Sequence, residues 1–148
     1  MTKIIVTGGL GFIGSNLINL LIKRKFYVIN LDKISYSSNF DNIAESRKSK
    51  KYKFIKIDIN EQKRLYNIFK KYRPKAIFNL AAESHVDRSI DNPFSFIKSN
   101  ILGVYNLLEA FKKYSKKNKL SKLIHVSTDE VYGDILKGRT SENHPYKP

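Results

Sequence analysis

The chain opens with a glycine-rich segment whose spacing suits phosphate binding. Gly8, Gly11 and Gly14 follow the apolar run 3–7, which is typical of a buried parallel strand, and precede the helix-like stretch 15–25. In a strand–turn–helix unit, such glycines permit a tight turn, let a pyrophosphate approach the backbone and let the helix pack on the strand. The free N–H groups at the helix start then favour phosphate. The segment predicts a dinucleotide site; the alternative is that the glycines serve turn geometry alone.

Asp32 is the second candidate, because it ends the apolar run 26–31 and follows Gly14 by 18 positions. A carboxylate at about 20 positions accepts hydrogen bonds from the adenosine ribose of a bound dinucleotide. It also repels a 2′-phosphate, which favours NAD over NADP. Lys33 leaves this preference open, since a neighbouring cation tolerates the phosphate.

Asp129 and Glu130 form an adjacent carboxylate pair after the apolar run 122–126. Two carboxyl groups leaving a strand end can reach different atoms of one ligand. If their surroundings separate their pKa values, one serves as acid and the other as base. A solvated acidic loop is the competing interpretation, and spacing alone favours that loop.

The remaining pattern predicts elements that bring these groups together. Apolar runs at 3–7, 26–32, 52–57, 76–80 and 122–126 alternate with helical segments, which indicates one α/β domain over residues 1–148, a Rossmann-type doubly wound parallel sheet of order 3-2-1-4-5. The carboxyl ends of all five strands then meet at one edge. The segments expected there are Gly8–Gly14, Asp32, Asp58, Leu80–Ser84 and Ser127–Glu130. Asp58 reads either as an adenine contact or as the N-cap of the next helix.

Three helical segments carry apolar stripes. The stripe of the first is expected at Ile13, Leu17, Leu20 and Leu21, and that of segment 61–72 at Leu65, Ile68 and Phe69. A long helix is expected from Pro93 to about Lys117. Its wide stripe comprises Phe94, Ile97, Ile101, Val104, Leu107, Leu108 and Phe111, and we expect it to be mostly core, with breadth enough for a subunit interface. Segment 35–51 reads as a loop with a short helix, and segment 81–89 as a polar loop.

Composition narrows the classes of partner. The net charge is +15, from 28 Lys+Arg against 13 Asp+Glu. Because most cations are lysines scattered over surface segments, we favour solvated faces over a nucleic-acid surface and expect no nucleic-acid partner. No apolar run reaches the ~18 residues of a membrane span, no signal-peptide pattern opens the chain, and there is no Cys. These features predict a cytoplasmic protein without a membrane partner. No second His or Cys lies at metal-ligand spacing from His85, so no metal is expected.

Five segments together resemble a known family. TGGLGFIG, LDK at Asp32, DI at Asp58, NLAAESHVDRS and STDEVYGD resemble the extended short-chain dehydrogenase/reductases that act on nucleotide sugars, and within them the 4,6-dehydratases. The resemblance spans all 148 residues in order. The adjacent Asp-Glu pair distinguishes this resemblance from the related families. Similar 4-epimerases lack the pair, and similar GDP-mannose dehydratases and UDP-glucuronate decarboxylases usually show Ser-Glu.

The resemblance implies a bound NAD and a nucleotide-linked hexose substrate. The positions that it matches to the cofactor are Gly8, Gly11, Phe12, Ile13, Gly14, Asp32, Lys33, Ile34, Ser35, Asp58, Ile59, Leu80, Ala81, Ala82, Glu83, Ser84 and Ser99. Ser84 and Thr128 match substrate contacts.

The resemblance also implies catalytic roles. The sugar is oxidised at C4, Glu130 removes the C5 proton, Asp129 protonates the departing C6 hydroxyl, and the hydride returns to C6. Thr128 hydrogen-bonds the sugar near its C4 oxygen. The product is a 4-keto-6-deoxy sugar, for which rhamnose synthesis is the common use.

The chain departs from the family in one respect. The family's Tyr-x-x-x-Lys, which removes the C4 hydroxyl proton and binds the nicotinamide ribose, is expected to be absent, since neither Tyr132 nor Tyr146 is followed by Lys at the fourth position. We therefore expect an amino-terminal portion that ends before the last strands and the substrate domain, is inactive alone, and forms a homodimer when full length. A dTDP or a UDP sugar, a 4-epimerase, and a non-catalytic NAD-binding module or gene remnant stay open.

Overall fold

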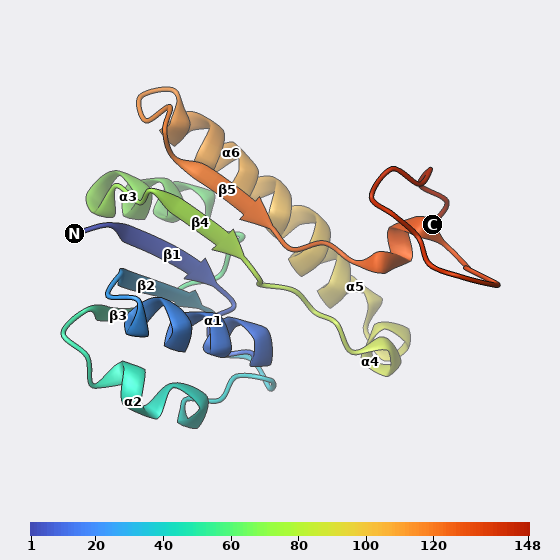
Figure 1. The fold of residues 1–148 in the computed structure, drawn as a ribbon, viewed down its shortest axis with the longest axis horizontal. Coiled ribbons are helices and arrows are strands. Elements are labelled where there is room, and N and C mark those ends of the chain that lie inside the picture. The colour runs from blue at the N-terminus through green and yellow to red at the C-terminus, as the bar shows by residue number, and fades with distance from the viewer.

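A five-stranded parallel sheet forms the centre of the molecule (Figure 1). The computed structural model describes the backbone of residues 1–148 and all side chains except those of Val86 and Arg88. The strands are β1 (Lys3–Thr7), β2 (Tyr27–Asp32), β3 (Tyr52–Lys56), β4 (Ala76–Asn79) and β5 (Lys122–His125). Their order is β3-β2-β1-β4-β5, so the predicted fold class and strand order are confirmed.

Two apolar layers cover the two faces of the sheet. Along β1, Ile4 and Val6 pack in the layer of α1 (Phe12–Lys23), while Ile5 packs in the layer of α3 (Gln62–Tyr72) and α6 (Val104–Ser115). Strand side chains alternate between faces, so a strand buried on both sides is apolar throughout. Leu65, Ile68 and Phe69 of α3 are buried as predicted.

The inward face of α1 differs from the expectation. Ile18 is fully buried, whereas Ile13 and Leu20 are 60% and 49% exposed. The cause is Gly14, where a Cβ would lie only 2.2 Å from the carbonyl oxygen of Gly8. Because Gly14 must face the turn, Ile18 and Leu21, which lie four and seven positions later, face the sheet on the same side of the helix. Leu21 is buried as expected.

The long helix begins at Pro93 as predicted, with Asn92 as N-cap, but it is not uniform. It comprises α5 (Pro93–Phe96), a π-helical segment η2 (Ile97–Gly103) and α6. The expectation that its apolar stripe is mostly core is wrong, because Phe94, Ile97, Ile101 and Leu108 are exposed. The sheet-facing residues of η2 and α6 are instead Ser99, Gly103, Leu107, Ala110 and Tyr114.

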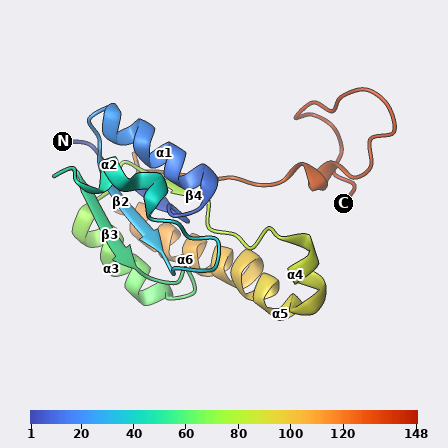
Figure 2. The same ribbon diagram turned by 90° about the horizontal axis from the view of Figure 1, so that it is seen from below.

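The connecting segments hold shorter helices. The expected short helix in segment 35–51 is present as η1 (Asp41–Ile43) and α2 (Ala44–Arg47). Segment 81–89, expected as a loop, becomes helical at α4 (Val86–Asp91). After β5 the chain leaves the sheet, forms η3 (Asp129–Tyr132) and extends away from the other elements (Figure 2). Among the residues described, no helix is long and apolar enough to cross a membrane.

A buried amide links β2 to β3. Asn30 is fully buried, and its Nδ2 donates to the hydroxyl of Tyr52 at 2.9 Å. Burial raises the pKa of Tyr52 above its usual 10.0. The folded chain therefore favours the neutral phenol.

We expect Tyr52→Phe to lower the free energy of unfolding by about 1–2 kcal/mol at neutral pH, because the Asn30 amide loses its acceptor. A raised folded-state pKa gives stability that is complete below the unfolded value of 10.0 and is lost as the pH rises through the folded value. The gap between wild type and variant should therefore narrow above pH 10. Urea unfolding from neutral pH to above pH 10 measures it, with Tyr105→Phe at an exposed tyrosine as control. A gap independent of pH contradicts the assignment.

Candidate functional site

The glycine turn fits between the carboxyl ends of β2 and β4. Gly8 has a positive φ of 66°, and its N–H donates to the carbonyl oxygen of Leu31 at 2.9 Å. A Cβ at Gly8 would meet backbone atoms of Leu80 and Ala81 at 2.7 Å. A Cβ at Gly11 would meet only the Gly8 oxygen, at 3.4 Å. Gly8 is thus required by the fold, while Gly11 leaves backbone accessible beside a cleft.

Asp32 fixes this turn as well as facing the cleft. Its carboxylate accepts from the backbone N–H groups of Leu10 at 3.0 Å and Ile34 at 2.8 Å, and from the Ser38 hydroxyl at 3.0 Å. The residue is only 7% exposed. Ser38 was not foreseen, although a serine a few residues after a strand-terminal aspartate is a common partner in such turns.

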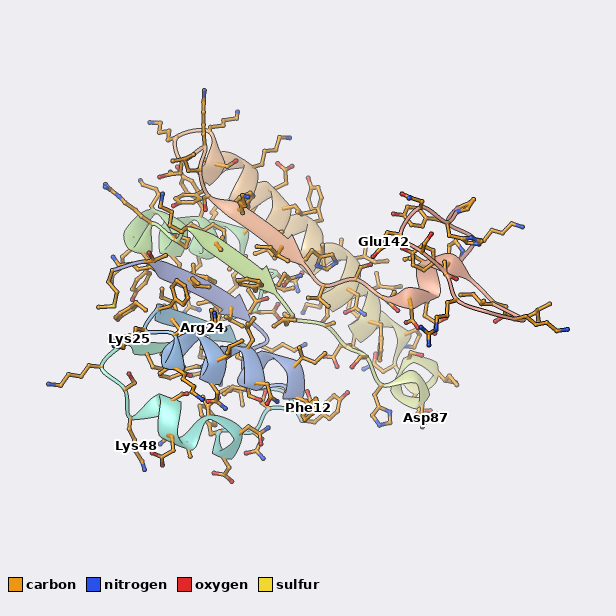
Figure 3. The ribbon with its side chains drawn as sticks, viewed as in Figure 1. Phe12, Arg24, Lys25, Lys48, Asp87 and Glu142 are labelled. Atoms are coloured by element: carbon orange, nitrogen blue, oxygen red, sulfur yellow. The ribbon has the colours of Figure 1, made fainter. Side chains whose placement is uncertain are left out.

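An open cleft of about 530 Å³, part of it solvent, lies at this edge of the sheet. The predicted residues that line it are Gly8, Gly11, Asp32, Lys33, Ser35, Asp58, Ile59, Leu80, Ala81, Ala82 and Ser99. Leu31, Ser37, Ser38 and Ile57 line it without having been predicted. Phe12, Ile13, Gly14, Ile34, Glu83 and Ser84 do not line it. Phe12 stands at the first turn of α1, at the end of the sheet towards which the strands run (Figure 3).

Asp58 shapes the turn after β3. Its Oδ1 accepts from the backbone and side-chain amides of Asn60, at 2.9 and 2.8 Å. The N-cap of α3 is Glu61, so the N-cap interpretation of Asp58 is wrong. The carboxylate holds its own turn and borders the cleft.

A cluster of polar groups joins three elements beside the cleft. Lys33 Nζ forms an ion pair with Glu83 Oε1 at 2.7 Å and donates to Ser99 Oγ at 3.1 Å. Asn100 was not foreseen; it bonds both the N–H and the carbonyl of Glu83. Hydrogen bonds between a side-chain amide and the backbone leave no periodic pattern in the sequence, so this role of Asn100 could not be predicted.

The predicted catalytic residues lie apart from the cleft. Thr128 Oγ1 accepts from the N–H of Glu130 at 3.3 Å, and Thr128, Asp129 and Glu130 are all exposed. They belong to η3 and the residue before it, beyond the carboxyl end of β5 (Figure 2). None of them lines the cleft among the side chains that the structure describes. The structure therefore does not bring this pair to the predicted cofactor residues.

The spacing Tyr-x-x-x-Lys does occur in the sequence, although not after Tyr132 or Tyr146. The string occurs at Tyr52–Lys56 and at Tyr66–Lys70. Neither pair lines the cleft; Tyr52 bonds Asn30 between strands, and Lys70 Nζ lies over the Tyr66 ring at 5.7 Å. The raised pKa of Tyr52 is also opposite to what a tyrosine base requires. That the family's catalytic pair is missing from the chain stays a prediction.

No group of three or more His, Cys, Asp or Glu side chains suited to a metal ion lies within the described part of the chain. The donors gathered at the sheet edge are instead backbone amides, hydroxyls and single carboxylates. Such a set suits an organic ligand with phosphate and hydroxyl groups.

A known family matches almost the whole chain. The family described as GDP-mannose 4,6 dehydratase has a sequence profile that matches residues 5–148. The chain belongs to this family.

Relatives with assigned names agree with the match. The dTDP-glucose 4,6-dehydratase of Neisseria meningitidis serogroup B is 43% identical over 158 aligned positions, and that of Haemophilus influenzae is 44% identical over 156. Each alignment covers 100% of this chain but 44% and 46% of the relative, respectively. The chain thus spans less than half the length of these relatives.

Solved structures share the fold. DesIV, a dTDP-glucose 4,6-dehydratase from Streptomyces venezuelae solved with NAD and TYD bound, superimposes with a TM-score of 0.86 at 35% identity over 99% of this chain and 46% of its own. A UDP-glucose 4-epimerase from Thermus thermophilus with NAD gives 0.83 at 31% identity, over 99% and 45%. The fold alone therefore does not separate the dehydratase from the epimerase.

We expect Gly8→Ala to cost about 2–4 kcal/mol of stability, because it combines a left-handed backbone with a backbone clash. Gly11→Ala should cost about 1 kcal/mol or less, since its Cβ meets a single atom and the residue is a helix N-cap. Urea unfolding of the two variants checks the difference. Equal costs would show that the close approach at β4 does not hold the turn.

Proposed function

We propose that the chain forms the NAD-binding part of a dTDP-glucose 4,6-dehydratase, which converts dTDP-glucose to dTDP-4-keto-6-deoxyglucose. The observation that carries the proposal is the conjunction of two features. A cleft at the carboxyl edge of the sheet combines a glycine turn with a strand-terminal aspartate, and an adjacent Asp-Glu pair follows the last strand. The first feature suits the cofactor, and the second suits elimination of water.

The residues around the cleft fit NAD. Gly11, whose Cβ position is nearly free, leaves room for a ligand at the start of α1, where the helix dipole favours the pyrophosphate. Asp32 retains acceptor capacity for the adenosine ribose, because an ionised carboxylate has about four lone-pair sites and three are used within the chain. Ala81 and Ala82 are small enough for a flat ring to lie against the end of β4.

NAD, when bound, supplies hydride transfer. In the proposed reaction Glu130 acts as base towards the C5 proton of the sugar, and Asp129 acts as acid towards the departing C6 hydroxyl. Thr128 donates to the C4 oxygen. Two carboxyl groups with different protonation states are required, and adjacent residues leaving one strand can face different sugar atoms.

The proposed site needs groups that the cleft does not contain. Asp129 and Glu130 are remote from it, and no Tyr–Lys pair lines it among the described side chains. The 148 residues alone therefore bind NAD weakly and do not turn over substrate. We further propose a cytoplasmic homodimer for the complete protein and a product used in rhamnose synthesis; the exposed Phe94, Ile101 and Leu108 support the dimer.

We expect NAD to bind the isolated chain in the millimolar range. Amide chemical shifts recorded during a titration should move at the glycine turn and around Asp32, because these groups border the cleft. Lys48 and Lys50 do not line the cleft and serve as internal controls. Shifts confined to surface lysine segments would contradict the cofactor site.

We expect no conversion of dTDP-glucose by the isolated chain, measured by product analysis. A chimera tests the chemistry: this chain replaces the matched segment of the Neisseria meningitidis relative. It should form the 4-keto-6-deoxy sugar, and Asp129→Asn and Glu130→Gln should each slow it by about 10²–10⁴-fold. Formation of a C4 epimer from UDP-glucose would instead favour an epimerase. Turnover by the isolated chain that Asp129→Asn abolishes would overturn the claim that it is inactive alone.

A further inference from the structure

The ammonium group of Lys33 is held by acceptors on two other segments of the chain. Lys33 follows Asp32 directly, and its ammonium lies 2.7 Å from Glu83 Oε1 and 3.1 Å from Ser99 Oγ. These partners belong to the segment after β4 and to η2. The charge of Lys33 is thus paired with the Glu83 carboxylate beside the cleft.

Glu83 is fixed independently of Lys33. Asn100 Oδ1 accepts from the N–H of Glu83 at 2.8 Å, and Asn100 Nδ2 donates to the Glu83 carbonyl at 2.7 Å. This two-bond pairing resembles that of neighbouring strands. The Glu83 side chain is 11% exposed, so its carboxylate has few other positions available.

The Lys33–Glu83 ion pair is better shielded from solvent than an ordinary surface pair. Lys48 and Glu45 also approach to 2.7 Å, but their side chains are 73% and 86% exposed. Exposed pairs contribute little, whereas partly buried pairs are screened less by water. Lys33 is 37% exposed and has a second acceptor in Ser99. Its placement is therefore specified by the fold.

Glu83 itself does not line the cleft, but Lys33, Ser99 and Asp32 do. Glu83 acts on the ligand site through Lys33. With Lys33 withdrawn, Asp32 is the charge that a 2′-phosphate on the adenosine ribose would meet, and like charges repel.

We propose that Glu83, positioned by Asn100, sets the preference for NAD over NADP by withdrawing Lys33 from the adenosine ribose. The inference rests on the proposed function, because it assumes that NAD occupies this cleft. In this proposal Glu83 is a positioning residue that acts through Lys33, since it does not itself line the cleft.

The test compares the dissociation constants of NAD and NADP for the whole chain and for Glu83→Gln, followed by chemical shifts. The variant keeps the shape of the side chain and the backbone pairing with Asn100 but releases the ammonium. We expect the NADP dissociation constant divided by the NAD dissociation constant to fall by about tenfold, because NADP binds more tightly. The affinity for NAD should change by less than about twofold. Lys33→Met/Glu83→Gln should restore the wild-type ratio, because no cation is then available.

Glu45→Gln is the matched control, since it makes the same change in a pair of the same length at the surface. It should leave the ratio unchanged. An unchanged ratio in Glu83→Gln, with NAD still bound, overturns the inference alone. A narrowed ratio that persists in the double variant also overturns it, because the freed lysine is then not the cause. Failure of the wild-type chain to bind either nucleotide overturns the proposed function and this inference with it.

Discussion

The close approach of Gly8 to the end of β4 is the constraint on which the site depends. With a left-handed backbone and no room for a Cβ, the turn after β1 lies against the Leu80–Ala81 peptide. Gly14 then packs on Gly8, which sets the rotation of α1. The Asp32 carboxylate fixes the same turn through the Leu10 N–H. Gly8 thus sets how the turn, α1 and the end of β4 meet at the cleft.

The elements that pattern alone predicted were those with strong periodicity. The five strands and their order followed from apolar runs, and α3 followed from its stripe. The buried faces of α1 and of the long helix did not follow, because small residues, Gly14 and Gly103, decide them. A Cβ at Gly103 would meet Ile59 at 2.8 Å, so this glycine faces the sheet although hydropathy points to its neighbours. Apolar periodicity identifies residues that can be buried, but it does not identify positions that require a small residue.

The candidate site was predictable where it is built from strand ends. Asp32, Asp58 and Ala81 border the cleft because parallel strands end at one edge. The hydrogen bonds that arrange these residues were harder to predict from the sequence. Ser38 and Asn100 act by single hydrogen bonds that leave no repeating signal, and Glu83 faces Lys33 rather than the cleft. The Asp129–Glu130 pair was noticed because its two carboxyl groups are adjacent, but its catalytic role was implied only by the family resemblance, and the pair does not line the cleft.

The π-helical segment η2 has a consequence for chain length. A π turn closes hydrogen bonds five residues back, so it accommodates one residue more than an α turn. Each residue of an α-helix adds about 100° of rotation. Ser99 and Asn100 lie within this segment, while Leu107 behind it anchors α6 in the core. A homologue with one residue fewer between Pro93 and Leu107 would therefore keep the core contact but turn these two side chains about a quarter of a circle. The orientation of Ser99 and Asn100 relative to the core therefore depends on the number of residues in this helix as well as on their identity.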